Sequence, residues 1–582
     1  MIHIERDVPI KMDDGIVLRA DVFRPDGTTP VPAILTLGPY GKGVPFQTGY
    51  KEQWEWLDRT HPNLLDGSTR SYLTWETVDP EIWVPWGYAV VRVDSRGAGR
   101  SPGYLDIYSP REVRDLHDAI EWAGTRKWCN GKVGLNGISY FAVNQWLVAS
   151  LQPPHLAAMI PWEGAADLYR DKYRHGGILS NAFLTSWFPR QVLCVQHGNP
   201  QAPLDPWTGK SVTGPEKLSE DELAANHSDP LQDALARPLY DQYFRARSAD
   251  WSKVTTPFLS AASLAGYGLH PRGNFEAFTQ ASSQHKWLET HPGRHEEWFY
   301  LEEGMALQKK FLDHFLKGED NGWDTQPPVM LRLRRPFSSD TIIRHEDEWP
   351  LARTEWTSLY LGAGHELGLE PSDGEISIDA LGDPVAFYTT PLQEEIELTG
   401  PLAATLYISS STSDADLFCT LQAFDPDGRE VHFPGTIDPA TPLAQGWLRA
   451  SHRKLDPKKT LPYRPYHSHD EIQPLEPGQV YELQIEIWPT CVILPAGYSI
   501  ALHISGHDFE RRGIEDDREV VWTARGSGPF LHTHPKDRPT DTFGGRTTVH
   551  TGWDTPSRLL LPVIPRKEWV NDDHFENQSN YR

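Results

Sequence analysis

The sequence has little that would support a disulfide-stabilised, membrane-spanning or nucleic-acid-binding protein. Only four of its 582 residues are cysteines, and they form no C-x-x-C pair, so neither a disulfide framework nor a zinc site is predicted. It contains no run of about 18 apolar residues, so we expect no membrane partner. The net charge of −25 predicts an acidic surface that repels phosphate backbones, which argues against a nucleic-acid partner.

Targeting and cofactor motifs are also missing. The N-terminal segment MIHIERDVPIKMDDG lacks the basic start and apolar core of a secretory signal, so we expect a soluble cytoplasmic protein. A mature form whose signal has been removed stays open. The sequence has no H-E-x-x-H motif and no dinucleotide-binding fingerprint, so neither a metal nor an organic cofactor is expected.

The composition predicts large folded cores. The chain is longer than the roughly 250–300 residues that one core usually supports, so we expect two or three domains. Apolar residues make up 38% of the chain and aromatic residues 11%, including 22 tryptophans, so extensive disorder is not expected.

The first third alternates short apolar runs with a helical pattern. Between the second and third runs, residues 111–123 carry apolar side chains at helical spacing. Continuous apolar strands alternating with helices are typical of a parallel sheet that is covered on both faces. The strand-like runs are 33–37, 88–93, 133–135 and 157–160.

The remaining chain changes character twice. Residues 161–250 show weak strand signals and several helical stretches, which predicts a helical insertion. A strand at 257–262 and a helix at 303–317 resume the first pattern. From about residue 351, short strands separated by turns predict a β-sandwich or jelly roll. Its clearest strands are 402–408, 481–488 and 498–505.

One segment has the layout of a nucleophile elbow. Residues 133–150 read as a strand, then Gly137-Ile138-Ser139, then an apolar helix. Such a turn exposes a serine hydroxyl at the helix N-terminus, which favours developing negative charge. The G-x-S pattern alone fits a structural turn equally well, and Phe141 stands where G-x-S-x-G has its last glycine.

Motifs along nearly the whole chain carry a family resemblance. Gly137-Ile138-Ser139-Tyr140, with Ala142 in place of a final glycine, is similar to the elbow of the cocaine esterase / X-prolyl dipeptidyl-peptidase (CocE/NonD) family of α/β-hydrolases. Further segments that look familial are Pro39-Tyr40, 94–101, 161–164, 268–273, 315–318, 487–490 and 495–497.

The resemblance implies an α/β fold: an α/β-hydrolase core with an inserted helical cap and a C-terminal β jelly-roll domain. The core would hold residues 1–160 and 251–350, the cap 161–250 and the jelly-roll β-sandwich 351–582.

The oxyanion hole would have two donors. In an elbow, the backbone N–H after the nucleophile supplies one, here that of Tyr140. The family supplies the second from a tyrosine hydroxyl after the first core strand, and Tyr40 matches that position. From the residue alone, a turn tyrosine packed at a strand end is the favoured interpretation, and the resemblance changes the preference to the functional role.

The general base is harder to choose among 24 histidines. Hydrolases of this fold run serine, acid, histidine along the chain, so the base should follow the cap. The family places it in a motif like W-S-H after a strand, and His291 in Trp287–His291 is the nearest match. His295 is the second choice, and a surface-loop histidine is the alternative for each.

The acid is where the sequence departs from the family. The expected aspartate position is Gly266, and no carboxylate lies between Ser252 and Glu276. Either the acid was replaced and the hydrolase weakened, or another carboxylate serves, with Glu163 the candidate. A third interpretation is that the site changed its task to a cyclisation, an acyl transfer or a lyase-type reaction.

The start of the cap would shape the substrate pocket. Aromatic walls with a few polar groups suit a small amphipathic acyl substrate. The candidate pocket residues are Trp162, Asp167, Tyr169, Tyr173 and His175.

We therefore predict a serine hydrolase, esterase/amidase or dipeptidyl-peptidase-like, that cleaves an ester or amide bond through an acyl-serine intermediate. The alternatives are a non-hydrolytic acyl transferase, cyclase or lyase on the same scaffold, and a binding protein built on an inactive hydrolase fold. The partner would be a small-molecule ester, amide or peptide-like substrate, and association as a homo-oligomer stays open.

Overall fold

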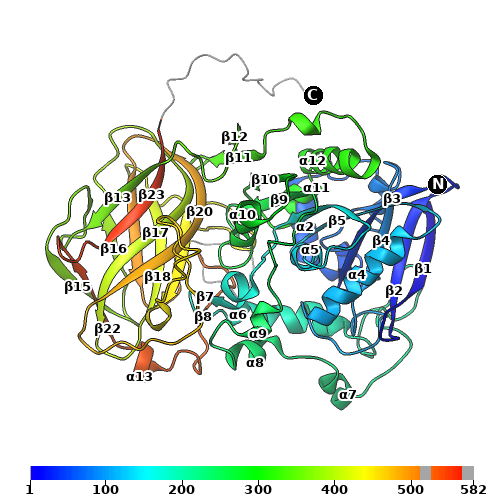
Figure 1. Cartoon of the computed structure of the whole chain (residues 1–582), viewed down its shortest axis with the longest axis horizontal. Helices are drawn as coiled ribbons and strands as arrows, with labels where there is room; N and C mark the ends of the chain where they lie inside the picture. Colours follow the sequence, from blue (N-terminus) through cyan, green and yellow to red (C-terminus); the bar gives the residue numbers. More distant parts are fainter. Residues whose placement is uncertain (1, 512–525, 566–582) are drawn as a thin grey trace.

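The computed structural model describes residues 2–511 and 526–565. Its N-terminal half contains a mixed sheet with a parallel centre, and its C-terminal part is made mainly of strands (Figure 1). No helix within these two ranges is long and apolar enough to cross a lipid bilayer.

The central sheet is parallel over seven neighbouring strands. Their spatial order is β4-β3-β5-β6-β9-β10-β11. All six residues of β4 are buried, as expected for a strand covered on both faces. The strands are β3 (Val31–Gly38), β4 (Ala89–Asp94), β5 (Cys129–Ile138), β6 (Leu156–Trp162), β9 (Phe258–Ser263), β10 (Lys286–His291) and β11 (Val329–Arg334).

Antiparallel strands extend this sheet at both edges. β1 (Ile2–Lys11) pairs with β2 (Val17–Pro25), which pairs with β4, and β12 (Thr341–Glu346) pairs with β11. The runs predicted as strands at 33–37, 88–93, 133–135, 157–160 and 257–262 overlap β3, β4, β5, β6 and β9. The α/β-hydrolase core predicted from the sequence is therefore present.

Helices cover the sheet and set the position of the site. α4 (Pro110–Gly124) begins where Ser109 accepts a hydrogen bond from the Glu112 N–H and Pro110 fixes the first turn. All residues of α5 (Tyr140–Ala149) are buried, so this helix lies inside the core rather than on its surface. The helix predicted at 303–317 is α12 (Glu302–Leu312), continued by η4 (Asp313–Lys317).

The segment after β6, where a helical insertion was predicted for residues 161–250, is built from short helical pieces. A two-stranded hairpin, β7 (Arg174–His175) and β8 (Ile178–Leu179), interrupts them. The helical pieces are η1 (Tyr169–Tyr173), α6 (Ala182–Trp187), η2 (Phe188–Val192), η3 (Leu193–Val195), α7 (Glu220–Ala225), α8 (Pro230–Leu235) and α9 (Gln242–Arg245).

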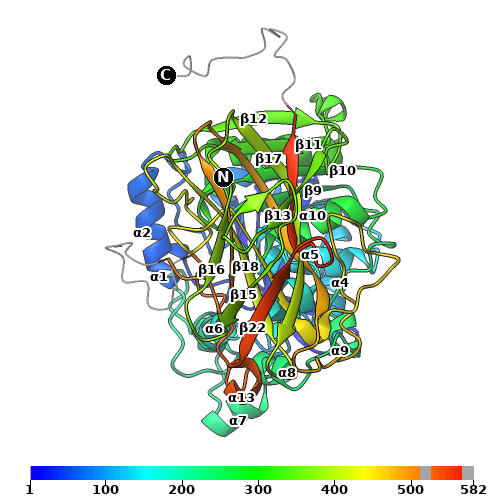
Figure 2. The same ribbon diagram turned by 90° about the vertical axis from the view of Figure 1, so that its left-hand side faces the viewer.

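The C-terminal part is antiparallel and has its own apolar core. Its strands face the viewer in Figure 2. Its longest strand, β17 (Ile396–Ser410), pairs with β20 (Tyr481–Leu494), β22 (Arg546–Thr551) and β23 (Arg558–Ile564). β18 (Asp416–Phe424) pairs with β19 (Ala444–Arg449) and β21 (Ser499–Ser505). The jelly-roll topology and the four domain boundaries stay predictions.

Candidate active site

Ser139 stands on a tight bend between β5 and α5. Its backbone is in a left-handed conformation, with φ of 56° and ψ of −109°, which is rare for a residue other than glycine. A Cβ atom at Gly137 would lie 2.8 Å from the Cβ of Phe141 and 3.1 Å from the carbonyl oxygen of Glu76. The bend therefore requires glycine two residues before the serine, and it projects the hydroxyl out of the sheet.

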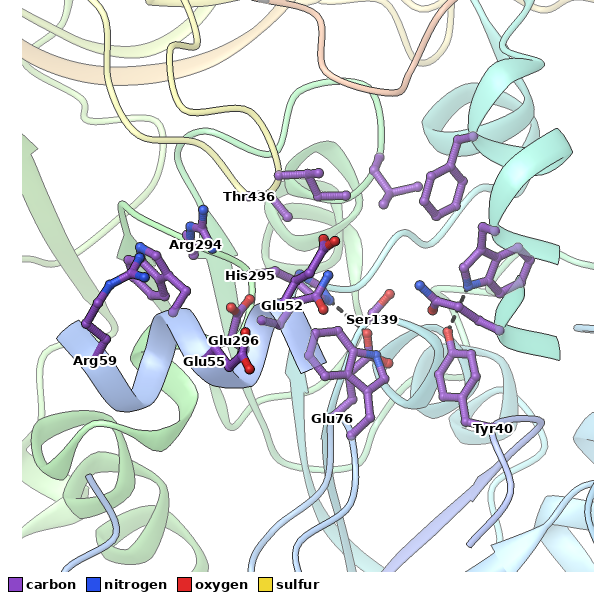
Figure 3. A pocket seen from close by; sticks show the side chains of 18 residues that line it. Tyr40, Glu52, Glu55, Arg59, Glu76, Ser139, Arg294, His295, Glu296 and Thr436 are labelled. Atoms are coloured by element: carbon purple, nitrogen blue, oxygen red, sulfur yellow. Dashed lines mark hydrogen bonds and ion pairs between the residues drawn. The ribbon is translucent and has the colours of Figure 1, made fainter. Parts of the chain in front are cut away.

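The hydroxyl faces a cavity of about 290 Å³ with aromatic and acidic walls (Figure 3). One wall comes from α2 (Lys51–Thr60), and Thr436 and Ile437 of the C-terminal part close another. The lining residues are Tyr40, Glu52, Gln53, Glu55, Trp56, Arg59, Trp75, Glu76, Ser139, Phe183, Trp187, Gln191, Leu269, Arg294, His295, Glu296, Thr436 and Ile437. Among the described residues, no group of three or more His, Cys, Asp or Glu side chains could hold a metal ion.

The imidazole beside Ser139 is that of His270. Its Nε2 lies 3.1 Å from Ser139 Oγ, and its Nδ1 accepts a hydrogen bond of 3.3 Å from the Ala165 N–H. Burial, and then the charge of His295, hold the pKa of His270 well below its ordinary value. This ring is therefore neutral at physiological pH. The sequence analysis had noted its segment, 268–273, as familial without giving it a role.

His291 does not contact Ser139, contrary to the prediction that it would serve as the base. Its Nδ1 lies 2.5 Å from Glu289 Oε1 and its Nε2 lies 3.1 Å from Glu163 Oε1, so both ring nitrogens face carboxylates. Its ring stacks on Trp162 with centroids 5.0 Å apart. The cause is positional: His291 is the last residue of β10 and stays in the sheet layer.

His295, four residues later, does reach the cavity. Its Nδ1 lies 2.7 Å from Glu163 Oε2 and its Nε2 lies 2.9 Å from Glu76 Oε1. Its ring is nearly parallel to that of His270, with centroids 5.5 Å apart. Burial lowers the pKa of His295, but Glu163 and Glu76 outweigh that effect and raise it to about 10. His295 is therefore an imidazolium held between two carboxylates.

Glu163 is the carboxylate at the centre of this arrangement. It follows β6, is fully buried, and has a left-handed φ of 51°. Burial raises its pKa, but His295 and His291 outweigh that effect and lower it to about 2. At Gly266, the position where an aspartate was expected from the resemblance, a Cβ atom would lie 2.7 Å from Thr436 Oγ1. An aspartate there would require Thr436 to move.

The two predicted oxyanion donors lie near the nucleophile. The N–H of Tyr140 begins α5 and so has no acceptor within its own helix. Tyr40 lines the cavity, and its hydroxyl accepts a hydrogen bond of 3.2 Å from Trp187 Nε1. That bond leaves the hydroxyl proton of Tyr40 available to a second acceptor.

The five pocket residues predicted from the start of the cap do not line this cavity. Trp162 stacks on His291, and Asp167 pairs with Arg170. The other three, Tyr169, Tyr173 and His175, are buried in separate contacts with Pro238, Phe244 and His532.

The cavity walls instead come from segments that the sequence analysis passed over. Phe183 and Trp187 lie on α6, later in the cap, and Glu52, Glu55 and Trp56 lie on α2. Glu76 was also missed, and no motif marks it. For α2, the sequence did offer a signal of a cavity wall: its helical repeat places acidic residues next to tryptophans.

Two family models match the chain. Residues 14–297 match the X-Pro dipeptidyl-peptidase (S15 family) model, and residues 321–560 match the X-Pro dipeptidyl-peptidase C-terminal non-catalytic domain. A crystal structure of a CocE/NonD family hydrolase from Staphylococcus aureus is 31% identical, covers 97% of this chain and 94% of its own, and has a TM-score of 0.81. The chain belongs to the CocE/NonD family of hydrolases.

Curated relatives of this CocE/NonD hydrolase are esterases and peptidases. A cocaine esterase from Rhodococcus sp. is 25% identical over 97% of this chain and 99% of its own length. A putative serine esterase from Mycobacterium bovis is 25% identical over 87% of this chain and 90% of its own. The chain is thus a serine hydrolase, and the transferase, cyclase or lyase alternative is not favoured.

Proposed function

We propose that this enzyme hydrolyses an ester or amide bond of a small acyl substrate through an acyl-Ser139 intermediate. The observation that carries the proposal is the 3.1 Å contact between Ser139 Oγ and His270 Nε2 at the wall of an aromatic cavity. A serine hydroxyl within hydrogen-bond reach of an imidazole is the pairing that nucleophilic acyl transfer needs.

In this proposal His270 exchanges the proton with Ser139. Its neutral ring can accept a proton at physiological pH, and the charge of Glu163 stabilises the imidazolium that forms. Accepting at Nε2 requires the tautomer with its proton on Nδ1, in which Nδ1 no longer accepts the 3.3 Å hydrogen bond from the Ala165 N–H. His270 would then return the proton to the leaving group and, in the second half, take one from water.

The carbonyl oxygen would receive hydrogen bonds from the Tyr140 N–H and the Tyr40 hydroxyl. Both donors are fixed by the elbow and by the end of β3, so little reorganisation accompanies the reaction. The aromatic walls of the cavity suit an apolar acyl or leaving group of modest size.

A fluorophosphonate probe tests the nucleophile and the base together. We expect the wild-type enzyme to be labelled, Ser139→Ala to give no labelling, and His270→Gln to label at least about 100-fold more slowly, because a general base contributes roughly 10²–10⁴. His295→Gln should retain more labelling than His270→Gln.

His175→Gln is the matched control, because His175 is buried against His532 and does not line the cavity of Ser139. Labelling that survives in His270→Gln and disappears in His295→Gln would assign the base to His295 instead. No labelling of the folded wild-type protein would reject the proposed function.

A further inference from the structure

Five buried side chains form an unbroken series of alternating carboxylates and imidazoles behind Ser139. The contacts run from Glu289 to His291 (2.5 Å), to Glu163 (3.1 Å), to His295 (2.7 Å) and to Glu76 (2.9 Å). Each of the five is at most 7% exposed. Both ring nitrogens of His291 and His295 contact carboxylates, and each carboxylate oxygen of Glu163 contacts a different imidazole.

The two ends of this carboxylate–imidazole chain line two different cavities. Glu76 lines the cavity of Ser139. Glu289 lines a second cavity of about 330 Å³, bounded by β11, β12 and α12. Glu289 and His291 are two residues apart on β10, so their side chains point to the same face of that strand.

The charges along the chain depend on one another. Burial lowers the pKa of His291, but Glu289 and Glu163 outweigh that effect and raise it to about 9. The two imidazolium rings in turn hold the pKa of Glu163 at about 2. Because the groups are buried, removing one charge changes the proton affinity of the next more than it would in water.

We propose that Glu289 is a remote positioning residue for the reaction at Ser139. It holds His291 as an imidazolium, His291 holds Glu163 as a carboxylate, and Glu163 fixes the ring of His295 that stacks on His270. Glu289 touches neither the nucleophile nor the substrate cavity. The proposal rests on the proposed function, because it concerns the charges that surround the same serine.

Other charged groups lie near the five side chains of the carboxylate–imidazole chain. Near His295 these are His270 at the start of α10 (Pro271–Gln280), Arg294 and Glu296, while Lys172 of η1 acts on Glu76. Around Glu289 the second cavity contributes Glu303 and Lys310 of α12, Arg332 of β11 and His345 of β12.

Glu289→Gln tests the proposal with 4-nitrophenyl butyrate as substrate. Without the charge of Glu289, the pKa of His291 falls and Glu163 loses one of its two cations, so the pKa of Glu163 rises. The part of the loss of kcat that accompanies protonation of Glu163 should therefore move to higher pH. At neutral pH, kcat should fall about three- to thirtyfold with KM little changed, as for coupling between sites joined by packed networks. Glu289→Asp should recover part of the rate.

Glu303→Gln is the matched control. Glu303 lines the same second cavity, but it pairs with Arg332 and is not part of the carboxylate–imidazole chain. It should leave the pH profile unchanged. A Glu289→Gln profile that matches wild type, or a loss that is independent of pH, would overturn the proposal. Should Glu289→Gln not fold, Glu289→Asp decides through a smaller shift in the same direction, because its shorter carboxylate keeps the charge but lies farther from His291. An unshifted Glu289→Asp profile with a lowered kcat would then overturn the proposal.

A measurement without substrate separates this inference from the proposed function. The imidazolium N–H protons of His291 and His295 should give low-field NMR signals in the wild-type enzyme, and both should move in Glu289→Gln. An inactive wild-type enzyme with these signals would reject the hydrolytic proposal alone. An active enzyme in which the His295 signal ignores Glu289 would reject the role of Glu289 alone.

Discussion

At the residue scale, the hydroxyl of Tyr40 is the proposed side-chain donor of the oxyanion hole. It lines the cavity of Ser139 and receives a hydrogen bond from Trp187 on its far side. Tyr40→Phe should lower kcat by about 10²–10³, because one oxyanion donor is lost while the ring and its packing remain. Steady-state kinetics on 4-nitrophenyl butyrate measure this, and KM should change far less.

Tyr50→Phe is the control for this substitution. The Tyr50 ring packs edge-on against that of Tyr40 at 6.3 Å, is equally buried, and does not line the cavity of Ser139. Its kcat should stay near the wild-type value. Equal losses in the two variants would mean that packing of the aromatic cluster, rather than a hydroxyl donor, supports the rate.

At the scale of the element, the turn from β5 to α5 fixes the nucleophile. Gly137→Ala would place a methyl group 2.8 Å from the Phe141 side chain and 3.1 Å from a backbone carbonyl, so the turn must shift. We expect a loss of about 1–3 kcal/mol in the free energy of unfolding, as for other overpacked sites. Labelling of Ser139 by a fluorophosphonate should slow at the same time.

Gly368→Ala supplies the comparison for that substitution. Gly368 lies in β14 (Leu367–Gly368), and the nearest atom to an added Cβ there is 3.9 Å away. Chemical denaturation should show little change in its stability. If Gly137→Ala were as stable and as readily labelled as Gly368→Ala, the close approach at the elbow would not matter.

At the scale of the whole molecule, the C-terminal part helps to build the site. Its Thr436 lines the cavity, and the Thr436 carbonyl accepts a hydrogen bond of 3.2 Å from the His295 N–H. Asp537 ties the same part to the cap, 2.8 Å from Arg174 and 3.0 Å from Arg449, in buried surroundings. The position of His295 therefore depends on how the two parts pack.

Asp537→Asn should destabilise the protein by about 3–5 kcal/mol at neutral pH, because two buried guanidinium groups lose their shared partner. Burial raises the pKa of Asp537, but Arg449 and Arg174 outweigh it and lower the pKa to about 2. The stability from the ionised carboxylate is present above pH 3.8, the unfolded value, and is lost as the pH falls toward 2.

Thermal unfolding of wild type and variant across this pH range measures both effects. The difference between them should shrink below pH 3.8. Asp541→Asn, on the neighbouring exposed turn α13 (Thr540–Phe543), should match wild type throughout. A constant difference down to pH 2 would mean that the carboxylate charge is not what holds the two parts together.

The sequence by itself determined the local features of this protein. Continuous apolar runs marked the parallel strands because both faces of such strands are buried, and the strand–glycine–serine–helix order marked Ser139 because a tight bend leaves few alternatives. The tertiary structure alone decided which imidazole meets the serine. His270, His291 and His295 lie within 26 residues of sequence, counting both ends, yet only their depth in the sheet and the packing of Glu76 and Glu163 separate their surroundings. Contacts between residues far apart in sequence leave no local pattern in the sequence. The partners of each imidazole therefore follow from the folded core and not from any motif.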